Sequence, residues 1–234
     1  MKILALDTAT ENCSAALLID GRLLAREVEF DRGHAEHILP MIDLLLIEAG
    51  LRLAEVDAIA FGRGPGGFTG VRLAASIAQG LAFGAGLPVV PVSDLAALAQ
   101  RAFDLAFSPE RVLVCSDARM QEVYWACFQL AENGLGKVLG AEHVGPPQSV
   151  TLPDAWADAP ARSVAGIGRG FRAYPTLANL VAPRVAVARD DLLPRAAEVA
   201  RLAALDVAAG RLLRPEEAIP VYLRDDVARP QARP

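Results

Sequence analysis

The feature that most constrains the fold is a plan that occurs twice along the chain. Lys2–Leu18 reads KILALDTATENCSAALL, and Arg111–Phe128 reads RVLVCSDARMQEVYWACF. In each stretch an apolar strand ends at an aspartate, Asp7 or Asp117, and a polar turn leads into a second apolar strand. A strand, an acidic turn and a strand repeated in the same order predict two related subdomains, each opening with a β-meander.

Hydrophobic periodicity and turn residues predict the remaining elements. In the first half we expect strands at 2–6, 15–19, 23–30 and 56–61, helices at 35–49 and 70–83, and a strand that ends at Val92. Pro40 is expected to kink the first helix or to mark its true start. The predicted domains are 1–103 and 104–234, with the C-terminal helix and tail free to pack back on the first.

Composition limits the classes of partner. The 234 residues are 53% hydrophobic, which is enough for a substantial core, and the net charge is -5. An acidic chain has no basic field to neutralise phosphates, so we expect any tRNA to be bound only indirectly, through a partner.

The ends and the cysteines indicate the compartment. The start, MKILALDTATEN, is neither a signal peptide nor a membrane span, so a cytoplasmic protein without membrane contact is expected. Cys13, Cys115 and Cys127 lack C-x-x-C spacing, which favours reduced structural thiols.

A glycine-rich loop, FGRGPGGFTGVR, covers Phe61–Arg72. Its first glycines satisfy G-x-G-x-x-G, but Pro65 interrupts the turn and the next acid is Asp94, beyond the following strand. A P-loop would need Lys-Ser/Thr where Phe68-Thr69 stands. The alternatives are a phosphate-binding loop and a tight strand-to-helix turn that needs glycine for its backbone.

Two α/β halves that each open on a meander ending in Asp resemble the sugar kinase, actin and Hsp70 (ASKHA) superfamily, which implies a duplicated α/β fold. In the ATPases of that superfamily the opening hairpins hold an Asp and a glycine against nucleotide phosphates. Here Asp7 and Asp117 are kept, but neither turn has the glycine that lets backbone approach phosphate. An autonomous ATPase or sugar kinase is therefore the weaker alternative.

Four motifs in order resemble the TsaB (YeaZ-type) family: ILALDTATENCSAAL, GRGPGGFTGVR, DARMQEVYWA and PVYLRDDV. The resemblance runs from Met1 to about Val227, with Gly67 where the family usually has serine. It implies a noncatalytic scaffold in making N6-threonylcarbamoyladenosine on tRNAs that read ANN codons. The implied partners are the transferase TsaD and the ATPase TsaE, and a second copy of the chain when TsaD is absent.

No catalytic or metal-binding residue is expected. TsaD carries a metal-binding histidine pair, and the matching positions here are Asp94 and Leu98, which cannot hold a metal together. His34 and His37 share a predicted helix start, but a catalytic zinc needs a third ligand, so a role at the helix terminus is favoured over a metal site. No serine lies in a G-x-S-x-G elbow, which makes a peptidase the least favoured alternative.

The two helices are richer in apolar and small residues than a single core face needs, and there is no charge from Leu73 to Ser93. Either the protein's own sheet covers both helices, or they form a partner interface, which the resemblance favours. The expected interface residues are Ile38, Met41, Ile42, Leu45, Leu73, Ser76, Ile77, Gly80, Leu81 and Gly84. The resemblance also implies that this chain alone binds no cofactor, whereas ATP or ADP at the assembled interface could contact Asp7, Gly64, Gly66 and Gly67.

Overall fold

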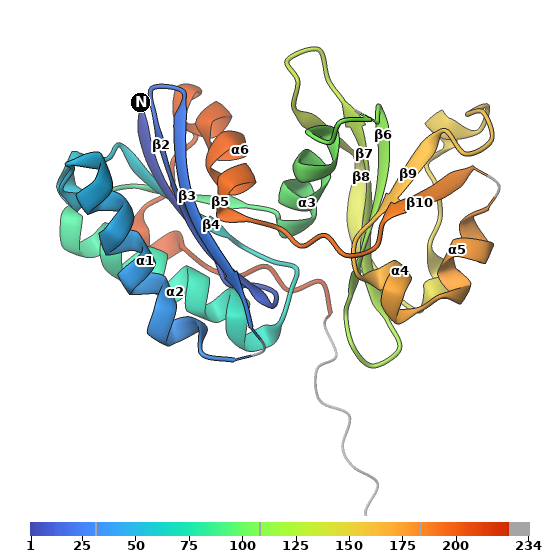
Figure 1. The fold of residues 1–234 in the computed structure, drawn as a ribbon, viewed down its shortest axis with the longest axis horizontal. Helices are drawn as coiled ribbons and strands as arrows, with labels where there is room; N and C mark the ends of the chain where they lie inside the picture. Colours follow the sequence, from blue (N-terminus) through green and yellow to red (C-terminus); the bar gives the residue numbers. More distant parts are fainter. Residues whose placement is uncertain (31, 108, 183, 225–234) are drawn as a thin grey trace, which may run out of the picture.

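The computed structural model describes residues 1–30, 32–107, 109–182 and 184–224, and it contains two sheets that lie side by side (Figure 1). The first sheet has the order β3-β2-β1-β4-β5. Its strands are β1 (Lys2–Asp7), β2 (Asn12–Ile19), β3 (Arg22–Glu29), β4 (Ala58–Gly62) and β5 (Val89–Val92). The second sheet has the order β10-β9-β6-β7-β8. Its strands are β6 (Arg111–Asp117), β7 (Val123–Leu130), β8 (Gly136–Gly145), β9 (Val164–Ile167) and β10 (Val185–Arg189).

The two sheets share one topology. In each, the first strand of the subdomain pairs antiparallel with the second and parallel with the fourth, and the third and fifth strands form the edges. The aspartates of the repeated motif take equivalent places, because β1 ends at Asp7 and β6 ends at Asp117. The prediction of two related subdomains that open with a β-meander is confirmed.

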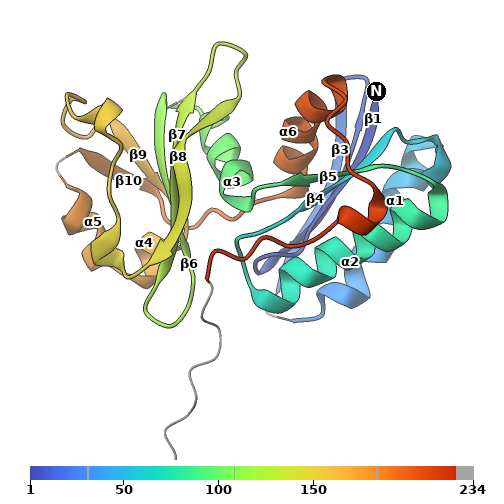
Figure 2. The same ribbon diagram turned by 180° about the vertical axis from the view of Figure 1, so that it is seen from behind.

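Helices cover both faces of the first sheet, as Figures 1 and 2 show. On one face lie α1 (His34–Ala49) and α2 (Phe68–Ala85), which pack against a buried cluster that includes Leu4, Leu6 and Leu17. On the opposite face α6 (Ala196–Ala208) packs against Ile3, Ala5 and Ala16. The alternation of side chains along β1 supplies both faces, which is why its sequence is apolar throughout.

The second sheet is covered by shorter elements. One face packs against α3 (Asp94–Phe103), through Leu95, Leu98 and Phe103. The other face packs against α4 (Gly170–Ala173) and α5 (Thr176–Val181). Short 3₁₀ turns complete the described elements: η1 (Leu53–Glu55), η2 (Pro147–Ser149), η3 (Asp154–Trp156) and η4 (Pro215–Glu217).

Helices α3 and α6 also contact each other between the sheets. Helix α3 covers the second sheet, whose first strand follows it directly in the chain. Helix α6 follows the second sheet but covers the first, so the first sheet depends on a helix from a distant part of the chain. The division at residue 103 itself stays a prediction.

Most predicted boundaries agree with the structure to within a few residues. Pro40 lies inside α1, which begins at His34, so this proline does not mark the start of the helix. The second helix begins at Phe68, two residues before the predicted start. In the described ranges no helix is long and apolar enough to cross a membrane.

The three cysteines are buried and form no disulfide. Burial raises the pKa of the Cys13 thiol to about 11 and of the Cys127 thiol to about 12, and it also raises the pKa of Cys115. Such thiols stay protonated and unreactive, in agreement with a structural role.

Candidate partner interface and interdomain cleft

The glycine loop between β4 and α2 is packed against the chain's own first hairpin. The backbone N–H of Gly67 donates to the carbonyl of Ala9 at 2.7 Å, and the N–H of Gly64 donates to the Asp94 carboxylate. A Cβ atom on Gly66 would lie 2.5 Å from the Ala9 oxygen, and one on Gly70 would lie 2.0 Å from the Thr8 oxygen. The hairpin therefore occupies the space that these glycines leave open, which favours an architectural turn over a phosphate site.

Asp94 faces Asp7 rather than solvent, and both carboxyl groups are buried, with one oxygen of each lacking a hydrogen-bond partner among the described residues. Each carboxyl group affects the pKa of the other. Leu98, the second position that matches the metal-binding pair, is fully buried in the core of the second sheet. Asp94 thus forms an internal contact between α3 and β1, and Leu98 packs α3 against the second sheet.

His34 and His37 lie at the start of α1 and contact Phe30. The Nε2 atom of His34 is 2.8 Å from the Thr10 carbonyl, and both imidazole rings lie within 5 Å of the Phe30 ring. Within the described parts of the chain, no three His, Cys, Asp or Glu side chains are grouped to hold a metal ion.

A cleft of about 420 Å³ lies between the subdomains, at the carboxyl ends of β1 and β6. Gly66 and Gly67 line it, as expected for the two surface positions of the glycine loop. Asp7 and Gly64 are buried and do not line it. Nucleotide contact by Asp7, Gly64, Gly66 and Gly67 in an assembly stays a prediction. Burial of Asp7 follows from its place at the end of a central strand.

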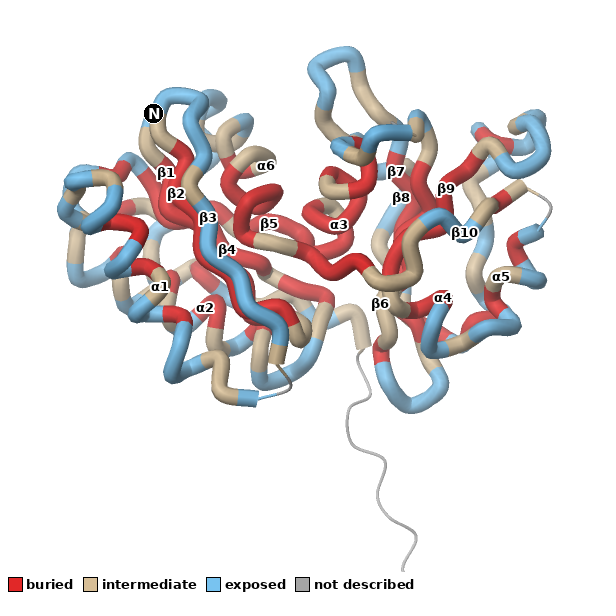
Figure 3. The backbone as a smooth tube through the Cα atoms, in the orientation of Figure 1, coloured by how far each residue is buried: buried red, intermediate tan, exposed pale blue. Residues whose placement is uncertain are grey.

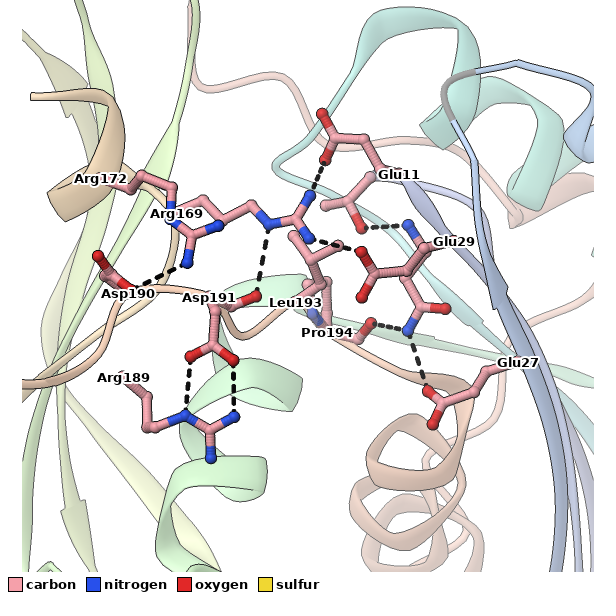
Figure 4. A network of polar contacts seen from close by, with 12 residues as sticks. Glu11, Glu27, Glu29, Arg169, Arg172, Arg189, Asp190, Asp191, Leu193 and Pro194 are labelled. Atoms are coloured by element: carbon pink, nitrogen blue, oxygen red, sulfur yellow. Dashed lines mark hydrogen bonds and ion pairs between the residues drawn. The ribbon is translucent and has the colours of Figure 1, made fainter.

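The arginines that line the cleft form ion pairs, and Figure 4 shows those of Arg169 and Arg172. Arg169 contacts Glu11 at 3.4 Å and Glu29 at 2.6 Å, and Arg119 reaches Glu11 at 3.1 Å. Arg172 pairs with Asp190 in the second subdomain. The contacts of Arg169 and Arg119 tie the second subdomain to the first hairpin. In the described part of the chain, the cleft therefore has no cluster of free cations for phosphate.

A second set of contacts between the subdomains involves Glu142 on β8. Glu142 accepts from Arg63 at 3.1 Å and from the Ser93 hydroxyl, which also caps α3 by accepting from the Ala96 N–H. The loop after β4 and the start of α3 are thus fixed together against the second sheet.

The exposed side of α2 is a single stripe at i, i+4 spacing. Phe68, Arg72, Ser76, Gly80 and Gly84 are all exposed, whereas Val71, Ala74, Ala75, Ala78 and Ala82 are buried against the sheet. A Cβ atom added at Gly80 or Gly84 would meet nothing within 4 Å, and Phe83 beside them is 79% exposed. Another helix could approach this stripe closely, because its middle has almost no side chains.

The predicted residues of α1 need correction. Ile38, Ile42 and Leu45 are at most 2% exposed and pack in the core of the first sheet, so they cannot lie on a partner surface. The apolar residues that α1 exposes are Leu39, Leu44 and Ile47, the last at 75%. Because α1 has apolar residues on every side, its sequence does not show which side faces the sheet. Met41, Leu73, Ile77 and Leu81 are partly buried at the margins of the exposed surface.

Arg211–Arg224, here called the C-terminal strap, runs from the edge of the first sheet past α2 toward the cleft, in red in Figure 2. Leu213 pairs with Val89 on β5, and the N–H of Val221 donates to the Arg63 carbonyl at 2.8 Å. Tyr222 contacts α2, and Arg224 donates to Glu122 and to the Ala118 carbonyl in the second subdomain. The strap thus connects the exposed helix α2 with the hairpin loop that carries Asp117.

Comparison with known proteins identifies the family of this chain. Residues 28–230 match the family described as "TsaD: tRNA N6-adenosine threonylcarbamoyltransferase". The chain is 42% identical over 235 residues to "tRNA threonylcarbamoyladenosine biosynthesis protein TsaB" of Escherichia coli (strain K12), covering 97% of this chain and 96% of that protein. The identity to the Haemophilus influenzae Rd protein of the same description is 40%, covering 97% and 95%.

The structural comparison agrees. "YeaZ from Pseudomonas aeruginosa" superposes with a TM-score of 0.86 at 48% identity, over 95% of this chain and 99% of that one. Both sheets have equivalent strand orders, so the fold is the duplicated α/β arrangement that the repeated motif predicted. Matched in sequence and in fold along nearly its whole length, the chain belongs to the TsaB family of tRNA threonylcarbamoyladenosine biosynthesis proteins.

Proposed function

We propose that this chain is a noncatalytic subunit in the biosynthesis of N6-threonylcarbamoyladenosine on tRNA, working in the cytoplasm on tRNAs that read ANN codons. Its relatives carry that biosynthesis in their names, and the chain also matches the transferase family itself. In this proposal the chain binds and supports a TsaD-type transferase, and a TsaE-type ATPase belongs to the same assembly.

The observation that carries this proposal is the exposed surface of α1 and α2. Leu39, Leu44 and Ile47 on α1, and Phe68 and Phe83 on α2, are between 44% and 79% exposed. Large apolar side chains gathered on one face are costly in water and are typical of a protein interface. A second copy of the chain would cover the same surface when the transferase is absent.

The residues that replace the metal-binding pair support a noncatalytic role. Asp94 is paired with Asp7 and Leu98 is buried in the core, so neither side chain is available to substrate. A nucleotide held by the assembly would meet this chain at Gly66 and Gly67, the two of the four predicted contacts that line the cleft.

Reconstitution tests the proposal. The purified chain, given tRNA and threonylcarbamoyl-adenylate, should form no modified adenosine and should hold no stoichiometric zinc or iron. Adding the TsaD-type and TsaE-type proteins of the same organism should produce modification, and the tagged chain should copurify with them. Modification that persists after rigorous removal of the TsaD-type protein would overturn the noncatalytic role.

A further inference from the structure

Arg72 is the one charged residue in the 18 residues of α2. It lies on the exposed stripe, between Phe68 one turn before it and Ser76 one turn after it. Successive positions of such a stripe are about 6 Å apart along the axis, so a partner helix that crosses Ser76 and Gly80 also covers Arg72.

The Arg72 side chain is held in one orientation by two aromatic residues. Its guanidinium carbon lies 3.5 Å from the centre of the Phe68 ring and 5.4 Å from that of Tyr222, and the two rings are 6.0 Å apart. Its Nε–H donates to the Tyr222 hydroxyl at 2.6 Å. The rotamer freedom that an exposed arginine normally loses on binding is therefore already restricted.

The terminal nitrogens of this guanidinium have no acidic partner within residues 1–30, 32–107, 109–182 and 184–224. Among the described residues no Asp or Glu forms an ion pair with Arg72, whereas most other arginines near the cleft have one. Since Tyr222 uses only the Nε–H, the parallel N–H groups on the two terminal nitrogens stay available. That pair of donors matches the two oxygens of a carboxylate.

A partner that covered Arg72 without an acid would bury an unpaired charge, which is strongly unfavourable. We propose that Arg72 binds an aspartate or glutamate side chain of the TsaD-type protein that docks on α2, and so selects that protein. The inference rests on the proposed function, because it names the chemistry by which the α1 and α2 surface recognises its transferase partner.

Affinity measurements with the TsaD-type protein of the same organism test the inference. For the wild type, Kd should rise between 50 mM and 500 mM NaCl. Arg72→Ala and Arg72→Gln should weaken binding about 30-fold or more at low salt and flatten the salt dependence, since one partner of a covered charge pair is lost. Arg72→Lys should lose less affinity, because lysine keeps the positive charge but not the pair of parallel N–H donors. Arg22→Ala, an exposed arginine on β3 away from this surface, is the matched control and should bind as the wild type does.

Two results would overturn the inference. One is wild-type affinity in Arg72→Gln, which would show that only packing matters at this position. The other is loss of self-association in Arg72→Glu while transferase binding is unchanged. That outcome would assign the contact to a second copy, whose α1 exposes Glu36 and Asp43.

Gly80→Arg, measured in parallel, separates this inference from the proposed function. If Gly80→Arg abolishes binding and Arg72→Gln does not, the surface is right and the carboxylate contact is wrong. If neither variant changes binding, the docking surface fails as well.

Discussion

Asp7, at the end of β1, and Asp94, at the start of α3, are joined carboxyl to carboxyl inside the protein. Asp7 is fully buried and Asp94 is 2% exposed. One oxygen of each has no partner unless a proton lies between them, and burial followed by the charge of Asp7 raises the pKa of Asp94 well above its ordinary value of 3.8. We infer that the folded pair keeps one proton to a higher pH than a free aspartate does, because two adjacent carboxylates cannot both ionise at low cost.

This pair predicts a specific pH dependence of stability. With a raised folded-state pKa, the contribution is fully present below pH 3.8 and is lost as the pH rises through the folded-state pKa. Asp94→Asn keeps a donor toward Asp7 at every pH, so its free energy of unfolding relative to the wild type should increase with pH. The increase should reach about 1.4 kcal/mol for each unit by which the pKa is raised.

Urea unfolding between pH 4 and pH 8.5 measures this difference. Asp43→Asn is the control, since Asp43 is exposed on α1 and its substitution should give a flat difference curve. A flat curve for Asp94→Asn as well would mean that the two carboxyl groups do not share a proton.

The loop glycines should differ sharply in their tolerance of alanine. Gly70→Ala puts a methyl group 2.0 Å from the Thr8 carbonyl oxygen, and overpacking of this kind should lower the free energy of unfolding by about 1–3 kcal/mol. Gly80→Ala, in the same helix but in open space, should raise it by up to about 1 kcal/mol. Chemical denaturation of the two variants decides this, and equal effects would contradict the packing described for the glycine loop.

Gly80→Arg should separate folding from association. Because nothing lies within 4 Å of an added Cβ, the arginine stays in water in the free protein, and the variant should remain folded. Against a partner helix it would clash and bury a charge, so binding to the TsaD-type protein and self-association should both be lost. Circular dichroism and size-exclusion chromatography measure the two properties, and Gly80→Ser should keep both. An unfolded Gly80→Arg variant would place this residue in the protein's own core.

Binding of tRNA by the isolated chain should be weak. With a net charge of -5 and most cleft arginines paired to acids, few cations are free to release counterions from phosphate. Filter binding at physiological salt should give a Kd above micromolar, and the affinity should appear when the transferase partner is added. Submicromolar binding with a steep salt slope would show that a basic surface had been missed.

The topology could be predicted from the sequence more completely than the exposed surface of the helices. Strands ending in Asp7 and Asp117 and the hairpins that follow are local patterns, so the duplicated meander could be predicted from them. Ile38 and Leu39 are equally apolar, yet one is buried and the other is 44% exposed. Which of two such neighbours faces the sheet depends on how α1 is rotated, and its sequence leaves that open.

Contacts between residues far apart in the chain also could not be predicted from the sequence. From the sequence, Asp94 is only the residue at a position where TsaD has a metal-binding histidine. Its contact with Asp7 depends on how β1 and α3 meet in the fold. Tyr222 and Arg72 are 150 residues apart in the chain, and no periodicity links them. On α2 the small residues Ser76, Gly80 and Gly84 are exposed, but Ala74, Ala78 and Ala82 have the same spacing and are buried. Spacing of small residues alone therefore does not identify the exposed side.

The packing of α6 on the first sheet affects how the protein is made on the ribosome. Ile3, Ala5 and Val90 belong to early strands, but they pack against Val199 and Ala203 of the later helix α6. Figure 3 shows β1, β5 and much of α6 in the colour of buried residues. One face of the first sheet therefore stays open to water while roughly a further hundred residues are synthesised, which takes about 5–20 s at bacterial rates. During that interval the nascent first subdomain exposes apolar strands, so it should depend on chaperones until the last helix leaves the ribosome.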